Sequence, residues 1–138
     1  MSYKRIIIWD LDETLVDSAH RVPKDSLLPL MKVFSALNHS ENYVAICTAR
    51  AMNQDDYDFL AANGISAHCI MCRPADGSEN HIKDPVLKAR KIQRLRNLKQ
   101  FNGLPVFMFD ESSPVIRKMR SIGVHCFNAI KLNKKLGA

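Results

Sequence analysis

No stretch of this 138-residue sequence is apolar for long enough to cross a membrane. Its longest apolar runs are short, as in Leu104–Phe109, whereas a membrane-spanning helix needs about 18 apolar residues. Near the N-terminus the apolar run Ile6–Trp9 is cut off by Asp10, so it is too short for a signal peptide. We therefore expect a soluble, unexported protein of the cytoplasm, with no membrane partner.

Internal repeats, low-complexity segments and linkers are also missing. Apolar residues make up 46% of the chain and charged residues 25%, a composition typical of a folded globular protein. The length is that of a single domain, so we expect one domain over residues 1–138. Aromatic residues are few. Tyr57, Phe59 and Phe101 could stack on nucleobases, but their positions favour a place in the core.

Metal-binding patterns built from cysteine and histidine are weak. Cys47, Cys69, Cys72 and Cys126 lie in or beside strand-like segments, and we expect reduced thiols. Cys69 and Cys72 have the spacing of half a zinc site, but no second pair follows. A zinc site needs four ligands, so a structural role is favoured over zinc or redox chemistry.

Acidic residues are in the minority. Twenty Lys and Arg stand against 14 Asp and Glu, for a net charge of +6, which favours a polyanionic partner. Between Lys83 and Lys99 there are seven basic residues and one acid. This segment is either a solvated helix face or a surface that follows the phosphates of a nucleic acid.

Strand and helix patterns alternate along the chain. The expected strands are Lys4–Trp9, Tyr43–Thr48, His68–Cys72, Leu104–Phe109 and Val124–Asn128. The expected helices are Lys24–Leu37, Met52–Asn63, Asp84–Phe101 and Ser113–Ile122, with Lys131–Leu136 as a terminal helix or a frayed tail. This alternation predicts an α/β fold with a doubly wound, mainly parallel five-stranded sheet.

Carboxylates follow two of the expected strands. Asp10 and Asp12 come directly after the first strand, and Asp110 and Glu111 after the fourth. Sheets of this type bind ligands beyond the carboxyl ends of their strands. If the two strands are neighbours, the four acids surround one crevice, and a set of oxygen ligands favours Mg²⁺.

Groups suited to a phosphate follow the other strands. Thr48 and Arg50 come after the second strand, where a hydroxyl and a guanidinium could hold phosphate oxygens. Lys83 opens the long helix after the third strand, a place where cations are disfavoured. The alternative for Thr48 is an ordinary helix cap.

Taken in order, these residues resemble the four motifs of the haloacid dehalogenase superfamily of phosphotransferases. The motifs are Asp10-x-Asp12-x-Thr14, Thr48, Lys83 and Asp110-Glu111. Within the superfamily the chain is most similar to the 3′-phosphatase domain of bacteriophage polynucleotide kinase/phosphatase. Ile70–Arg73, Lys83-Asp84, Phe109–Glu111 and Arg120–Cys126 carry that similarity. No phosphate loop of a kinase half is present.

The resemblance implies a role for each matching residue. Asp10 would be the nucleophile that forms an aspartyl-phosphate, and Asp12 the general acid and then the base. Asp10, the backbone carbonyl of Asp12, Asp110 and Glu111 would hold Mg²⁺, with Glu111 acting directly or through water. Lys83 would neutralise charge on Asp10, with Lys88 as the substitute for this role.

The remaining matching residues are expected to contact the substrate or support the loop. Thr48 would hydrogen-bond the transferring phosphoryl group, Thr14 would brace the first loop, and Arg50 and Arg73 would hold neighbouring phosphates. For both arginines a surface salt bridge is the alternative.

Members of the superfamily that this chain resembles often carry a cap domain before the second or the third motif. Here the segments before Thr48 and before Lys83 are short, so the resemblance implies a minimal cap or none, and an open site fits a polymer end. We therefore expect a Mg²⁺-dependent phosphatase acting on 3′-phosphate ends of nucleic acid, encoded by a phage and working in its host's cytoplasm. The alternatives are a phosphatase for phosphoproteins or free nucleotides, and a non-catalytic nucleic-acid-binding domain. The stretch Asp10-Leu11-Asp12-Glu13-Thr14-Leu15-Val16 also resembles the opening of protein phosphatases that act on RNA polymerase tails, so a protein substrate stays an alternative.

Overall fold

The computed structural model describes residues 2–18 and 26–137. Five strands form the centre: β1 (Arg5–Trp9), β2 (Asn42–Cys47), β3 (Cys69–Met71), β4 (Val106–Asp110) and β5 (His125–Asn128). The helices are α1 (Met31–Ala36), α2 (Gln54–Ala62), α3 (Asp84–Arg96), α4 (Ser113–Ser121) and α5 (Ala129–Leu136), with a short 3-10 turn at Lys99–Phe101.

The sheet has the strand order β3-β2-β1-β4-β5, and every described pairing is parallel. This confirms the expected α/β fold with its five-stranded parallel sheet. It also confirms that β1 and β4 are neighbours, with Trp9 opposite Phe109 in the register. The indole ring of Trp9 and the phenyl ring of Phe109 stack there, with their centroids 4.2 Å apart. The residues that follow each of these strands therefore emerge side by side.

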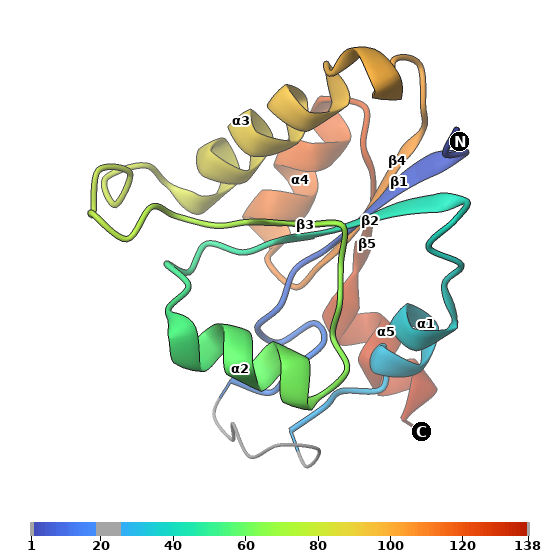
Figure 1. Cartoon of the computed structure of the whole chain (residues 1–138), viewed down its shortest axis with the longest axis vertical. Coiled ribbons are helices and arrows are strands. Elements are labelled where there is room, and N and C mark those ends of the chain that lie inside the picture. Colours follow the sequence, from blue (N-terminus) through green and yellow to red (C-terminus); the bar gives the residue numbers. More distant parts are fainter. Residues whose placement is uncertain (1, 19–25, 138) are drawn as a thin grey trace.

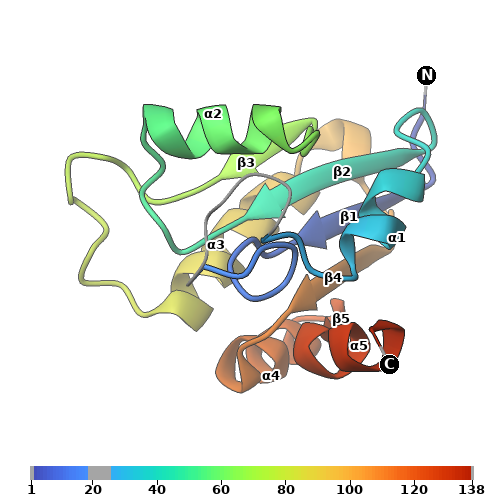
Figure 2. The same cartoon turned by 90° about the horizontal axis from the view of Figure 1, so that it is seen from below.

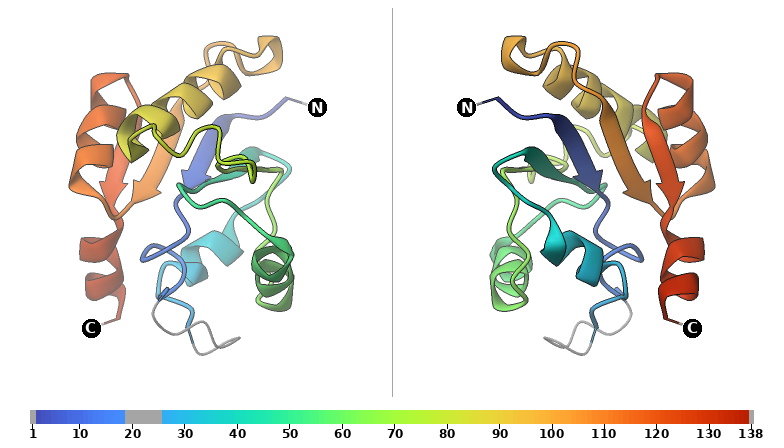
Figure 3. Two further views of the ribbon diagram at one scale, coloured as in Figure 1. Left: turned by 90° about the vertical axis from the view of Figure 1, so that its left-hand side faces the viewer. Right: turned by 90° about the vertical axis from the view of Figure 1, so that its right-hand side faces the viewer.

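Helices cover both faces of the sheet (Figures 1 and 2). One apolar core lies under α3 and α4 and includes Ile8, Met108 and Ile92. A second core lies on the opposite face, with Trp9 and Leu60 among its members, and α1, α2 and α5 lie on that side (Figure 3). Fully buried β-branched residues in β1 explain why this strand forms the middle of the sheet.

Two expected helices are shorter than their sequence patterns. Only α1 (Met31–Ala36) forms within the expected helix Lys24–Leu37, and residues 24 and 25 lie outside the described ranges. Residues 26–28 are extended because they pair with the loop after β1, where Leu28 N donates to Leu15 O over 2.8 Å. The expected helix Asp84–Phe101 ends at Arg96 and is followed by the separate 3-10 turn.

Other helix ends lie where capping residues in the sequence predict them. Asn53 and Asp56 form a reciprocal capping box at the start of α2. Gly64 follows α2 with a φ of 67°, a left-handed conformation that glycine adopts without strain. The C-terminal segment is a helix rather than a frayed tail, because the Asn128 side chain accepts from Lys131 N and caps α5. No helix in the described ranges is both long and apolar enough to cross a membrane.

Candidate active site

Asp10 lies buried at the carboxyl end of β1. Its side chain is 6% exposed, and its backbone N–H donates to Phe109 O over 2.9 Å. The hydroxyl of Thr14, itself fully buried, donates to Asp10 Oδ2 over 3.1 Å. Thr14 thus braces the loop, as expected, and orients the carboxylate directly. Between them Glu13 has a φ of 63°, a strained conformation of the kind that clusters at functional sites.

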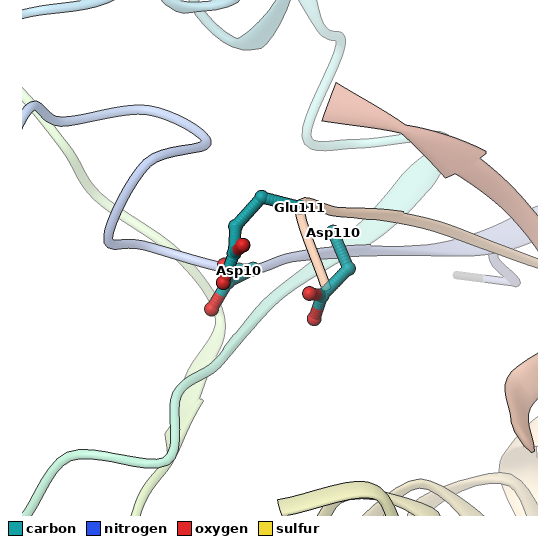
Figure 4. A group of neighbouring side chains, drawn as sticks. All are labelled: Asp10, Asp110 and Glu111. Carbon is teal, nitrogen blue, oxygen red and sulfur yellow. The ribbon is translucent and has the colours of Figure 1, made fainter. Parts of the chain in front are cut away.

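Three carboxylates converge from β1 and β4 (Figure 4). Asp10, Asp110 and Glu111 each place one oxygen so that all three lie within 4.8 Å of one another. Asp110 is fully buried, and its Oδ1 accepts from Ser112 N over 2.9 Å. The expected convergence of residues from two distant parts of the chain is therefore present.

The donor set of this cluster fits Mg²⁺. All three side chains offer oxygen, the atom that Mg²⁺ prefers, and carboxylates are its usual protein ligands. Among the described residues the side chain of Asp12 is not a member of this cluster, and a metal contact through its backbone carbonyl stays a prediction. In the part of the chain that the structure describes, Cys69 and Cys72 form no such group with other ligands. They pack against opposite cores of the sheet.

The ammonium beside Asp10 belongs to Lys88 and not to Lys83, which corrects the expectation from the sequence. Lys88 Nζ lies 2.9 Å from Asp10 Oδ1 and 2.7 Å from Asp110 Oδ2, with 4% of its side chain exposed. Lys83 is the exposed N-cap residue of α3. The reason is helical phase: Lys88 lies four residues before the buried Ile92, on the helix face toward the sheet.

Burial and charge together set the proton affinities at this centre. Burial raises the pKa of Asp10 to about 7, the Lys88 ammonium opposes that rise, and the neighbouring Asp110 adds to it. Burial lowers the pKa of Lys88, but the carboxylates of Asp10 and Asp110 outweigh it and the pKa is raised overall. Lys88 therefore stays charged between the two acids. Burial, followed by the charge of Asp110, also raises the pKa of Glu111.

Asp12 is held from the side by Arg50. The guanidinium donates from Nε and Nη2 to the two carboxylate oxygens of Asp12, over 3.1 and 2.8 Å. Its Nη1 donates to Asp56 Oδ1 over 2.8 Å. Because Asp56 is buried within the capping box of α2, the helix start, Arg50 and Asp12 form one connected network. Arg50 was expected to hold a substrate phosphate, and in this structure its fork instead grips Asp12.

Thr48 is buried and directly follows β2, the strand that pairs with β1 in the sheet. Its backbone N–H donates to Met71 O over 2.9 Å, and its Oγ1 accepts from Arg50 N over 3.2 Å. The residue is therefore at the same edge of the sheet as Asp10, where the sequence placed it. Its contact with Arg50 N is also the contact of an ordinary capping threonine.

Arg73 organises a loop instead of facing the carboxylate cluster. Its guanidinium donates to the backbone carbonyls of Ala49, Glu79 and Ile82, and to the side chain of Asp84. Its side chain is 11% exposed. Four of its five donors are thereby used, so the expected role in holding a substrate phosphate is replaced by a role in shaping residues 74–83.

Two contributors escaped the sequence reasoning. Asp56 could have been noticed as the partner of Asn53 in a capping box, but nothing local indicates that it also holds Arg50. Asn133 of α5 donates to Thr14 O over 2.9 Å and accepts from Leu30 N over 2.8 Å. It clamps the Asp10 loop to the C-terminal helix across 119 residues of sequence, and no local pattern signals such a contact.

Comparison with known proteins gives a family and a fold. The family model described as bacteriophage T5 5′-deoxynucleotidase matches residues 22–138. The 5′-deoxynucleotidase of Escherichia phage T5 is 31% identical over 87 residues, a match that covers 44% of this chain and 36% of that relative. The chain thus spans far less than the full length of this relative.

Two solved structures share the fold. A chain in the Pnkp1/Rnl/Hen1 RNA repair complex superposes with a TM-score of 0.66 at 22% identity, over 91% of this chain and 42% of that one. The D,D-heptose 1,7-bisphosphate phosphatase from B. bronchiseptica, complexed with magnesium and phosphate, gives a TM-score of 0.64 at 14% identity. That match covers 97% of this chain and 87% of the phosphatase chain.

Proposed function

Since this chain belongs to the bacteriophage T5 5′-deoxynucleotidase family and has a haloacid dehalogenase-like fold, we propose that it is a Mg²⁺-dependent phosphomonoesterase of nucleotides. The substrate class that the family favours is a deoxynucleoside 5′-monophosphate. The observation that carries the proposal is the buried cluster of Asp10, Asp110 and Lys88 with Asp12 poised beside it.

Asp10, Asp110, Glu111 and the backbone carbonyl of Asp12 are the groups that would hold Mg²⁺. When bound, the ion neutralises charge on the phosphate oxygens, so that an anionic nucleophile can approach an anionic ester. Lys88 would add a second positive charge beside Asp10. Most of the rate enhancement would then come from fixed charges aimed at the phosphoryl group.

The reaction proceeds in two displacements on phosphorus. A carboxylate oxygen of Asp10 forms a bond to phosphorus while the bond to the ester oxygen breaks, and protonated Asp12 gives its proton to the departing alkoxide. Water then loses a proton to Asp12 and attacks the aspartyl-phosphate, which releases phosphate and restores Asp10. Before the reaction begins, Arg50 fixes the orientation of the Asp12 carboxylate.

The test is release of inorganic phosphate in the presence of Mg²⁺. Deoxynucleoside 5′-monophosphates, ribonucleoside 5′-monophosphates, a 3′-phosphorylated oligonucleotide and a phosphopeptide are compared at equal concentration. We expect the deoxynucleoside 5′-monophosphates to be the preferred substrates and an Asp10→Asn variant to be inactive. Asn is close in size to Asp and Lys88 keeps its ion pair with Asp110, so this variant should remain folded. Turnover of more than a few per cent in Asp10→Asn would refute the nucleophile.

A second candidate function is removal of 3′-phosphates from nucleic acid ends. Two observations favour it: before β2 of the sheet, the described part of the segment after Thr14 holds only the extended pairing at residues 26–28 and α1, and the chain has a net charge of +6. A site without a large cap, on a chain of net positive charge, would be accessible to a polymer end. Faster release from the 3′-phosphorylated oligonucleotide than from any mononucleotide would select this candidate, and preference for the phosphopeptide would reject both.

A further inference from the structure

Positive charge is concentrated in the last part of the chain. Residues 85–138 hold twelve of the twenty Lys and Arg, and their only acids are Asp110 and Glu111 of the proposed catalytic centre. Within this part, α3 and α4 pack side by side on one face of the sheet (Figure 1). The outward surface of these two helices therefore carries cations with no acids among them beyond Asp84 at the first position of α3.

A groove of about 400 Å³ runs between the two helices. Arg90 and Arg94 line it from α3, Lys118 lines it from α4, and Val86, Ala89 and Ile122 supply apolar wall. Arg96 ties the helices together, because it donates to Gln93 Oε1 within α3 and to Ile122 O after α4. The groove is thus a feature of packed helices and not of loops.

The three cations of the groove are unused by the described part of the protein. Arg90, Arg94 and Lys118 are exposed, and their side chains make none of the ion pairs or hydrogen bonds found in the described residues. Other cations of the same region do have partners: Lys88 contacts Asp10 and Asp110, and Lys91 contacts Glu79 at 3.3 Å. Three neighbouring cations without acids repel one another, and an external anion would relieve that repulsion.

One end of the groove lies toward the catalytic centre, because Val86 lines it from the first turn of α3, two residues before Lys88. In a parallel α/β fold both helices start at the carboxyl edge of the sheet. Lys88 of α3 reaches Asp10 from that edge, and α4 follows Asp110 and Glu111 after one residue. A polymer lying in the groove therefore has one end near the centre that the proposed function assigns to a phosphate ester.

We propose that the α3–α4 groove binds the sugar-phosphate backbone of a single-stranded nucleic acid. Cations spaced along the groove meet the phosphates, and the apolar wall accommodates sugars or bases. Packed helices lie about 8–10 Å apart, so the valley between them takes one strand and is too narrow for a duplex. The position of the strand's end rests on the proposed function, whereas the binding itself does not.

The experiment measures binding by fluorescence anisotropy over a range of salt concentrations. The probe is a labelled single-stranded oligonucleotide with hydroxyl groups at its 3′ end and no terminal phosphate, so it offers no monoester to the catalytic centre. The test variant is Arg90→Gln/Arg94→Gln/Lys118→Gln. The control variant, Lys32→Gln/Lys134→Gln/Lys135→Gln, removes the same net charge from exposed positions of α1 and α5.

We expect the test variant to bind at least about tenfold more weakly than wild type at moderate salt. The slope of log affinity against log salt should fall by about 2, since each phosphate contact on a single strand contributes roughly 0.7. The control variant should bind like the wild type. Equal losses in both triple variants, or equal binding of a duplex probe, would overturn the proposal.

Hydrolysis of a deoxynucleoside monophosphate is measured in parallel on all three proteins. It should be unchanged in the test variant, because none of the substituted residues contacts the catalytic centre. Binding that survives in a protein without any phosphatase activity would reject the proposed function and keep the groove. Tighter binding of the wild type to vesicles of anionic lipid or to an acidic peptide than to the oligonucleotide would assign the groove to another polyanion and overturn the proposal.

Discussion

Replacing Lys88 by Met removes the single ammonium that separates two buried carboxylates. Its Nζ lies 2.9 Å from Asp10 Oδ1 and 2.7 Å from Asp110 Oδ2. Methionine keeps the length and much of the volume of the side chain, so the packing of α3 on the sheet should be preserved. The variant therefore changes charge at a site where almost no solvent can screen it.

The expected effect on stability is large. Removing one partner from a buried ion pair costs about 3–5 kcal/mol, because the remaining charge stays buried without compensation. Here two acids lose the same partner, and protonation of one of them limits the loss toward the lower end of that range. Mg²⁺ should recover part of the stability in the variant, since a dication at the carboxylate cluster supplies the missing charge. Catalysis should not recover, because the phosphoryl group loses a fixed positive charge.

The assay combines chemical denaturation with phosphate release at saturating Mg²⁺. Lys83→Met is the matched control, since it makes the same change five residues earlier in the chain at an exposed position. We expect kcat to fall about 10²-fold or more in Lys88→Met, in line with the loss of one fixed stabilising group, and to change little in Lys83→Met. If Lys83→Met proves the more damaging, or if Lys88→Met keeps near-normal kcat, the reasoning from the buried contacts is refuted.

Three further predictions concern other parts of the network and the surface. Asp56→Asn should lower kcat about tenfold with little change in KM, because Arg50 loses the carboxylate that orients it toward Asp12. A tenfold loss is a fraction of the 10²–10⁴-fold that acid–base catalysis contributes. A normal kcat and pH–rate profile would show that Asp56 does not have this role. Asp110→Asn should abolish the rise in melting temperature that Mg²⁺ gives the wild type, whereas a full Mg²⁺-induced shift would place the metal elsewhere. Burial lowers the pKa of His39, so the folded protein resists protonation of this side chain, and the free energy of unfolding falls as the pH drops below about 6.5, the pKa of histidine in the unfolded chain. The His39→Gln variant should therefore lose less stability than the wild type at acidic pH. Equal losses in the two proteins would contradict this prediction.

Local patterns in the sequence were sufficient for the architecture. The alternation of apolar strands and amphipathic helices predicted the parallel sheet, because burial on both faces demands continuous apolar strands. It also placed Asp10 and Asp110 at the carboxyl ends of two strands of one parallel sheet, where ligands bind. The carboxylate cluster required in addition that these two strands be neighbours, and the strand order of the folded sheet supplied that fact.

Helix ends were predicted less well where tertiary contacts compete with the pattern. The apolar spacing of the expected helix Lys24–Leu37 extends over residues that the structure uses in an extended pairing with Leu15. The backbone there satisfies its hydrogen bonds with a distant strand-like segment rather than within a helix. A periodicity of apolar residues cannot show which of these two sets of partners is nearer in space.

Charged side chains show most clearly where prediction from the sequence stops and the folded structure is needed. The sequence predicted a cation beside Asp10, but the segment that forms α3 and its N-cap contains both Lys83 and Lys88. Only the rotation of α3 against the sheet brings Lys88, and not Lys83, next to Asp10. Arg50 and Arg73 were both correctly placed after strands, yet one grips Asp12 and the other binds backbone carbonyls. Which chemical groups a chain carries at each strand end is a local property of the sequence. Which partner each long, flexible side chain meets depends on distances between elements far apart in the chain, and packing of the folded protein sets those distances.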